Sequence, residues 1–371
     1  MQYDFNDYVL TQAAVGLNSR SEVNLEYNPI ISAPMDTVIS KENAHLFRDQ
    51  GVNICYPRGL DVEPNEVDFV SVGLNEFKEL LDGEINLNNK KFCVDVANGN
   101  MPILHTYIKT AKEKWPNIII MSGNVASPEA FYALAKSGCD YIRVGVGSGS
   151  GCLTSVHTGV GQGMATTIIF CKRMLDVHAE LNCKIIADGG FKNYRDIILA
   201  LALGADYVML GGILNKCLES CAPKKIVVGA AIYNWVQSDL PLEFLDQSNS
   251  DNIDISFNQY LDFLKKFQLK FPLMEVETNP TKILKEKEIF VDYRGMSTKA
   301  VQKNWGREVL KSSEGLEKTN LVEYTISGWM ENFIDYLKSA MSYSGTKKLS
   351  EFKKFANCEL ISPAVYNRFN K

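Results

Sequence analysis

Short apolar runs alternate along residues 29–210 with longer segments in which apolar and polar positions are mixed. Most runs are rich in Ile or Val and end in Gly, Asn, Asp or Pro. Continuous β-branched runs of this length are typical of parallel strands that are buried on both faces of a sheet. The predicted strands are residues 29–34, 52–56, 67–72, 91–96, 117–121, 140–144, 184–187 and 206–210.

The intervening segments, such as 127–137 and 193–203, have the spacing of amphipathic or buried helices. Eight strands joined by crossover helices predict an α/β fold, the (β/α)8 TIM barrel. A doubly wound parallel sheet is the alternative. That fold usually carries a glycine fingerprint after its first strand, and this chain has none there.

The barrel rhythm stops after the eighth predicted strand. Residues 214–285 are too many for a connection between neighbouring elements, so we expect an inserted subdomain or lid, with a helix candidate at 257–271. A helical pattern at 327–341 fits the closing helix of the barrel. The predicted domains are therefore a (β/α)8 barrel catalytic domain, residues 1–213 and 286–371, and the insertion.

Composition narrows the class of protein. The 371 residues are 46% hydrophobic and 22% charged, which allows a large core and excludes a disordered chain. The net charge of −5 argues against a surface for nucleic acid or for a polybasic membrane contact. No apolar run approaches a membrane span and no export signal is visible, so we expect a cytoplasmic protein with reduced cysteines.

Small and polar residues gather where the predicted strands end, at the rim that carries the chemistry of such barrels. Glycine and asparagine often merely terminate strands. That explanation does not account for residues 145–161, Gly-Val-Gly-Ser-Gly-Ser-Gly-Cys-Leu-Thr-Ser-Val-His-Thr-Gly-Val-Gly. A glycine-rich loop brings backbone N–H and C=O groups close to a ligand, and its turned carbonyls can hold a cation. Backbone dipoles in such a loop favour the thiolate of Cys152, a candidate nucleophile, and Thr154 can hydrogen-bond a reacting group.

This loop resembles the active-site loop of the IMP dehydrogenase/GMP reductase family. Other motifs that resemble the family follow in the same order along most of the chain, outside 214–288 and the last 25 or so residues. They are Ile31-Ser-Ala-Pro-Met-Asp-Thr-Val38, Asp95-Val-Ala-Asn-Gly99, Ser122-Gly-Asn-Val125, Ala187-Asp-Gly-Gly190, Met209-Leu-Gly-Gly212, Tyr293-Arg-Gly-Met-Ser297 and Ser313-Glu-Gly315.

The resemblance implies a role for each matching residue. Cys152 would attack C2 of a purine nucleotide as a thiolate, and Thr154 and Glu314 would control protonation. Asp188 would hold the ribose hydroxyls. The remaining substrate residues would be Ser150, Gly190, Gly211, Gly212 and Tyr293 at the 5′-phosphate, with Gly189, Gly295, Met296 and Ser297 nearby, the last two along the base.

The family also implies ligands and an assembly. Asp95, Asn98, Gly99 and Asn124 would contact NADPH, or NADH or NAD, and the carbonyls of Gly147, Gly149 and Cys152 would bind potassium. A homotetramer is the usual assembly of these barrels. Plainer roles remain open: Asp95 and Asp188 could cap the helices that follow them, Tyr293 could be ordinary core, and Glu314 could lie on the surface.

The family contains two reactions, and three features favour the reductase. The CBS-domain pair usual in dehydrogenases is absent between the second and third barrel units, the interval 295–314 is short and lacks an Arg-Tyr dipeptide, and 95–99 and 313–315 resemble reductase motifs. The predicted activity is NADPH-dependent reductive deamination of GMP to IMP and ammonia through a cysteine thioimidate. Alternatives are oxidation of IMP to XMP with NAD, the same chemistry on a modified purine nucleotide, or nucleotide binding without catalysis.

Three positions depart from the family pattern. Lys311 stands where the reductase usually has arginine, Gln162-Gly163 replaces a Pro-Gln tract, and Arg58 ends a strand where histidine is usual. An ammonium cannot reproduce the planar double donation of a guanidinium to a purine edge. The departures therefore keep the modified-purine alternative open.

Overall fold

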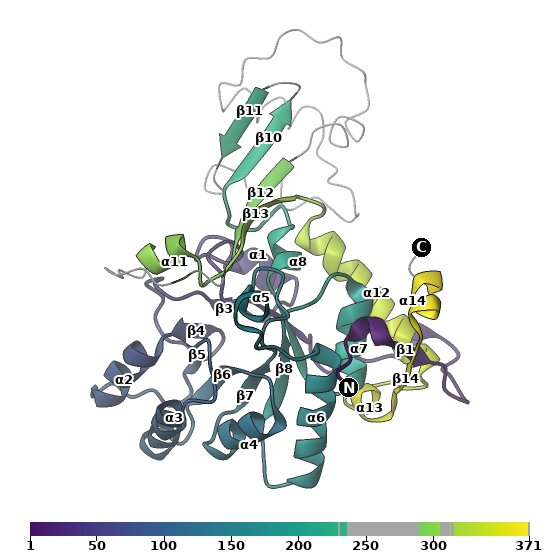
Figure 1. The fold of residues 1–371 in the computed structure, drawn as a ribbon, viewed down its shortest axis with the longest axis horizontal. Helices are drawn as coiled ribbons and strands as arrows, with labels where there is room; N and C mark the ends of the chain where they lie inside the picture. Colours follow the sequence, from purple (N-terminus) through teal and green to yellow (C-terminus); the bar gives the residue numbers. More distant parts are fainter. Residues whose placement is uncertain (229–230, 236–288, 305–311, 313–314, 370–371) are drawn as a thin grey trace.

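A computed structural model describes residues 1–228, 231–235, 289–304, 312 and 315–369. Eight parallel strands form a nearly closed barrel in the order β2-β9-β8-β7-β6-β5-β4-β3 (Figure 1). Their bounds are β2 Ile30–Ser32, β3 Cys55–Tyr56, β4 Phe69–Val72, β5 Lys91–Asp95, β6 Ile119–Val125, β7 Tyr141–Val144, β8 Lys184–Asp188 and β9 Tyr207–Leu210. All eight predicted strands are present, which confirms the barrel.

The two ends of this sheet meet between β2 and β3. Ile31 and Asn53 form a parallel bridge, and the Asn53 side-chain amide donates to the carbonyls of Asn28 and Ile30, both at 2.9 Å. The open edge of a doubly wound sheet is thereby removed, and that alternative is wrong.

Helices surround the barrel, and their ends follow local sequence signals. The helix α4 (Pro128–Lys136) begins after Ser127, whose hydroxyl accepts from the Ala130 N–H at 3.2 Å. The helix α7 (Tyr194–Leu203) begins after Asn193, which caps it in the same way, and ends at Gly204 with a φ of 121°. Both predicted helices are confirmed. The others in this part are α1 Ala44–Asp49, α2 Leu74–Asp82, α3 Pro102–Lys114, α5 Thr154–Thr158, α6 Met164–Val177 and α8 Gly212–Asn215.

A second, antiparallel sheet projects beyond the carboxyl ends of the barrel strands (Figure 1). Its order is β11-β10-β12-β13, with β10 Lys224–Val228, β11 Ala231–Trp235, β12 Ile289–Arg294 and β13 Glu317–Leu321; α11 (Lys299–Asn304) lies between the last two strands. The strands β12 and β13 lie after residue 285, in the part of the chain assigned to the barrel domain. They nevertheless share a sheet with β10, which lies in the predicted insertion. The helix candidate at 257–271 lies outside the described residues, and the domain boundaries remain a prediction.

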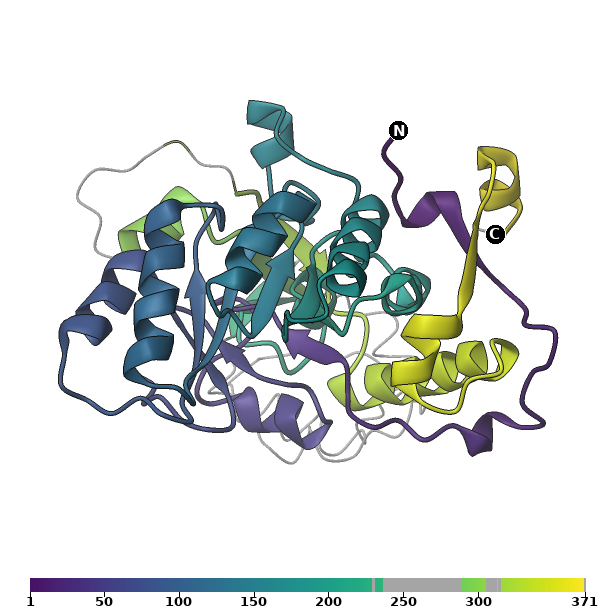
Figure 2. The same ribbon diagram turned by 90° about the horizontal axis from the view of Figure 1, so that it is seen from below.

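The chain returns to the barrel through α12 (Ile326–Tyr343), which confirms the predicted closing helix. Its Trp329 stacks between Phe333 and Tyr194 of α7, with ring centroids 5.5 and 5.3 Å away. Beyond it, α13 (Leu349–Phe355), β14 (Asn357–Leu360) and α14 (Pro363–Phe369) complete the described chain, and β14 pairs with β1 (Tyr8–Thr11) so that the terminal segments lie side by side (Figure 2). Two short 3₁₀ helices, η1 Phe5–Asp7 and η2 Arg20–Glu22, flank β1. Within the described residues, no helix is both long and apolar enough to cross a membrane.

Candidate active site

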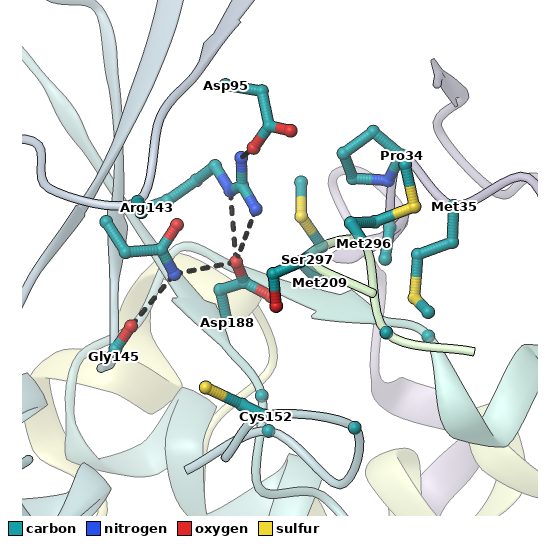
Figure 3. A pocket seen from close by; sticks show the side chains of 18 of the residues that line it. Pro34, Met35, Asp95, Arg143, Gly145, Cys152, Asp188, Met209, Met296 and Ser297 are labelled. Carbon is teal, nitrogen blue, oxygen red and sulfur yellow. Dashed lines mark hydrogen bonds and ion pairs between the residues drawn. The ribbon is translucent and has the colours of Figure 1, made fainter. Parts of the chain in front are cut away.

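A cavity of about 650 Å³ lies at the carboxyl ends of the barrel strands, next to the end of β12. It is lined by residues that follow most of the barrel strands and by the end of β12 (Figure 3). The structure brings together in its wall every predicted substrate residue: Ser150, Asp188, Gly189, Gly190, Gly211, Gly212, Tyr293, Gly295, Met296 and Ser297. Cys152 and Thr154 lie in the same wall, which places the candidate nucleophile where such barrels carry chemistry.

The glycine-rich loop leaves β7 in conformations that only glycine adopts readily. Gly145 and Gly147 have φ values of 127° and 79°. The loop then turns so that the Cys152 N–H donates to the Gly149 carbonyl at 2.9 Å. The partly buried Cys152 thiol lies 3.3 Å from the hydroxyl of Thr154, the first residue of α5. The Cys152 thiol and the Thr154 hydroxyl are thus held close together by a single turn of the chain.

Main-chain contacts join this loop to the second sheet. The Leu316 N–H donates to the Gly151 carbonyl at 2.9 Å, and the Gly295 N–H donates to the Leu316 carbonyl at 3.0 Å. A Cβ added at Gly295 would lie 2.4 Å from the Gly151 oxygen, so the two segments touch without side chains between them. Cys152 also forms an antiparallel bridge with Gly315. Glu314, which precedes Gly315, lies outside the described residues, and its role stays a prediction.

An arginine that the sequence reasoning did not single out forms the ionic centre of the cavity (Figure 3). Arg143 of β7 is only 7% exposed. Its Nη1 lies 2.5 Å from Asp95 Oδ1, and its Nε and Nη2 lie 3.0 and 2.8 Å from Asp188 Oδ2. Burial by itself lowers the pKa of Arg143, but the charges of Asp188 and Asp95 outweigh burial and raise the pKa above its ordinary value. The guanidinium therefore stays charged and orients both carboxylates.

Asp95 and Asp188 were expected either to contact a ligand or to cap the helices that follow them. The N-cap position of α3 is held by Met101, which makes no side-chain cap bond, and that of α7 by Asn193, so neither aspartate caps the helix that follows it and the capping role is wrong. Asp188 Oδ2 accepts from Arg143 and also from Asn124 Nδ2 at 2.8 Å. Among the described residues no donor reaches Asp188 Oδ1, and this oxygen can accept hydrogen bonds from a ligand. The signal for Arg143 in the sequence was a charged residue inside an apolar strand.

A tyrosine hydroxyl marks another part of the wall. Tyr293 of β12 is 5% exposed, and its hydroxyl lies 3.2 Å from that of Ser150. Burial raises the pKa of Tyr293, so its hydroxyl remains a neutral hydrogen-bond donor. Gly212 lies beside this pair, since a Cβ there would meet the Ser150 hydroxyl at 2.8 Å. Hydroxyls and backbone amides together can bind an anion without a formal positive charge.

Another part of the cavity wall is apolar. Pro34, Met35, Met209 and Met296 gather there with their side chains near one another (Figure 3). Thioethers are polarizable and adapt to flat surfaces. This wall therefore fits the face of a planar heterocycle.

The predicted cofactor residues, all described, divide into two pairs. Asp95 and Asn124 line the cavity, whereas Asn98 and Gly99 lie outside its lining. The Gly99 N–H donates to the Asn124 carbonyl at 2.9 Å, so Gly99 contacts a residue that lines the cavity, and the roles of Asn98 and Gly99 toward a cofactor stay predictions. Both amide hydrogens of Asn124 are used, by Asp188 and by the Gly145 carbonyl at 2.9 Å, and in the described part of the chain no donor reaches its Oδ1.

The predicted potassium ligands are carbonyls of the glycine-rich loop. The Gly147 carbonyl accepts from the Ser155 hydroxyl at 3.0 Å, and the Gly149 carbonyl accepts from the Cys152 N–H at 2.9 Å. A carbonyl oxygen has a second lone pair, so these bonds do not prevent cation binding. These two carbonyls therefore keep a lone pair that a cation could use, and the potassium site stays a prediction.

The remaining thiols differ from Cys152 in environment. Burial raises the pKa of seven of them: Cys55, Cys139, Cys171, Cys183, Cys217, Cys221 and Cys358. Cys93, deep in β5, lies 3.6 Å from Arg143 Nη1. None of these eight lines the cavity within the described chain, which leaves Cys152 as the thiol that faces it.

The fold and the cavity together define a (β/α)8 barrel enzyme with a cysteine at its centre. The model of the IMP dehydrogenase / GMP reductase domain matches residues 70–236. GMP reductase 1 of Mus musculus is 33% identical over 253 residues, which cover 61% of this chain and 72% of that protein. GMP reductase of Klebsiella pneumoniae is 32% identical, covering 59% and 71%, and GMP reductase 1 of Homo sapiens is 33% identical, covering 60% and 71%. The chain belongs to the IMP dehydrogenase/GMP reductase family.

Proposed function

We propose that the protein is a purine nucleotide oxidoreductase that converts GMP to IMP and ammonia with NADPH as reductant. The observation that carries the proposal is the placement of Cys152, Asp188 and Tyr293 in one cavity wall. A nucleoside monophosphate presents a base, a ribose and a phosphate. The three residues offer a nucleophile for the base, a hydrogen-bond acceptor for the ribose hydroxyls and a hydrogen-bond donor for the phosphate.

The chain would bind the substrate in three parts. The phosphate would accept from the hydroxyls of Tyr293 and Ser150 and from nearby backbone amides. The ribose hydroxyls would donate to Asp188 Oδ1, because Arg143 and Asn124 already occupy Oδ2. The methionine wall would hold the base with C2 toward Cys152.

Chemistry would begin when the Cys152 thiolate forms a bond to C2. The bond from C2 to the exocyclic nitrogen then breaks, and the nitrogen leaves as ammonia after gaining a proton. Thr154, 3.3 Å from the thiol, would relay this proton, and Glu314 would supply it. The pairing of Gly315 with Cys152 supports Glu314 as the acid, because Glu314 immediately precedes Gly315 in the sequence. Release of IMP finally returns the electron pair of the C–S bond to Cys152.

Two bound species would assist the chain. NADPH supplies the hydride that C2 receives, and Asp95 and the Asn124 Oδ1 would hold its carboxamide. Potassium on the loop carbonyls of Gly147, Gly149 and Cys152 would fix the shape of the loop. We further propose the homotetramer of the family, which light scattering on the purified protein tests.

Oxidation of IMP to XMP with NAD is the second candidate, because the matching domain model covers both reactions of the family. Two assays distinguish the candidates: GMP with NADPH, followed by the loss of absorbance at 340 nm and by ammonia release, and IMP with NAD, followed by the gain of absorbance. Turnover in the first assay supports the reductase. Turnover only in the second would replace it, and binding of GMP without turnover in either would indicate a modified purine or a binding protein.

A further inference from the structure

A fully buried asparagine joins the second sheet to the barrel. Asn215, in α8, has no exposed surface. Its Nδ2 donates to the Thr37 carbonyl at 2.9 Å and to the Asp292 carbonyl at 3.0 Å, and its Oδ1 accepts from Asn320 Nδ2 at 2.8 Å. One side chain therefore connects the loop after β2 with β12 and β13.

These contacts surround Tyr293. Asp292 precedes it, and Arg294 follows it with an ion pair to Asp36, in which Nε–Oδ1 is 3.1 Å and Nη2–Oδ2 is 2.6 Å. The strand β12 is therefore tied to residues 36–37 immediately before and after Tyr293. Between the two ties, the tyrosine hydroxyl reaches Ser150 in the cavity.

We propose that Asn215 is a positioning residue that fixes the Tyr293 hydroxyl at the phosphate end of the cavity. The inference rests on the proposed function, which assigns that end to the phosphate. An amide is buried without loss of stability only where its donors and acceptor are satisfied, and here all three bonds go to elements that hold Tyr293 or its neighbours. Asn43 is equally buried but binds the Val38 and Glu219 carbonyls instead, so it offers a matched control.

The test is a double-mutant cycle on GMP affinity, measured by calorimetry. Tyr293→Phe removes the hydroxyl, and we expect GMP binding to weaken about 10- to 150-fold, the usual range for one hydrogen bond to a charged group. Asn215→Ala should weaken binding by a similar factor. In the Tyr293→Phe background, Asn215→Ala should weaken GMP binding by less than a further twofold. The reason is that this variant has no tyrosine hydroxyl left to displace.

Two further variants separate positioning from stability. Asn320→Ala removes only the bond that orients Asn215, and the variant should fold because the Asn320 side chain is partly exposed. It should weaken GMP binding several-fold. In the Tyr293→Phe background, the same substitution should leave GMP affinity almost unchanged. Asn43→Ala should lower the melting temperature while GMP affinity changes less than twofold.

The outcomes distinguish the two proposals. Additive losses from Asn215→Ala and Tyr293→Phe, or an equal loss of affinity in Asn43→Ala, would overturn the positioning role and leave the reductase proposal in place. Failure of the wild-type protein to bind GMP or IMP would overturn both.

Discussion

Removal of the Arg143 guanidinium should destabilise the protein more than removal of any surface ion pair. The side chain of Arg143 is 9% exposed, and those of Asp95 and Asp188 are 15% and 14% exposed. Arg143→Leu would leave two nearly buried carboxylates without their shared countercharge. Loss of one partner of a buried pair costs about 3–5 kcal/mol, and at this burial solvent screens little of the effect.

The assay is urea unfolding followed by circular dichroism at pH 7, with GMP binding measured in parallel. Arg20→Leu is the control, because Arg20 pairs with Asp335 at 3.4 Å while the two side chains are 56% and 53% exposed; we expect a loss of at most about 1 kcal/mol there. GMP affinity should fall only in Arg143→Leu, because Asp188 loses its orientation. In that background, Asp95→Asn should recover part of the stability, since it removes one uncompensated charge. Equal losses in the two arginine variants would refute the reasoning.

Further predictions concern other groups of the chain. Burial raises the pKa of Glu219 from 4.5 to about 7, so the folded protein holds this proton more tightly than the unfolded chain and stability falls as pH rises through that interval. Glu219→Gln should therefore stabilise the protein at pH 8, by up to roughly 3 kcal/mol, and far less at pH 5; an equal gain at both pH values in urea unfolding would contradict this. Cys152→Ala should bind GMP normally and show no hydride transfer, and a tenth of wild-type turnover would be enough to remove Cys152 from the mechanism. Potassium should raise turnover above the rates in sodium or lithium at matched ionic strength, and equal rates in the three salts would argue against the cation site.

The barrel could be predicted because its signals are local. A strand such as β9 is a continuous apolar run because both of its faces are buried, and α4 and α7 begin after residues whose side chains cap them. The glycine-rich loop and residues 188–190 and 211–212 could be placed at the site because they follow barrel strands that all end at one rim, whereas residues 293–297 were assigned by resemblance to the family.

The ionic centre could not be predicted in this way. Arg143 meets Asp95 and Asp188 across 48 and 45 residues of sequence, and only closure of the barrel brings them together. The second sheet was missed for a related reason. Its strand β12 pairs with β10, far away in the sequence, so no local pattern joined them, and Asn215 fell within the predicted insertion.

The contact between Gly151 and Gly295 bears on which substitutions this site can accept. A methyl group on Gly295 would overlap the Gly151 carbonyl at 2.4 Å, and one on Gly151 would meet the Tyr293 ring at 2.9 Å. Neither glycine supplies a functional group, yet neither position can accept alanine without moving Cys152 or Tyr293. A substitution at either glycine should therefore displace Cys152 or Tyr293 and impair the site without removing any functional group.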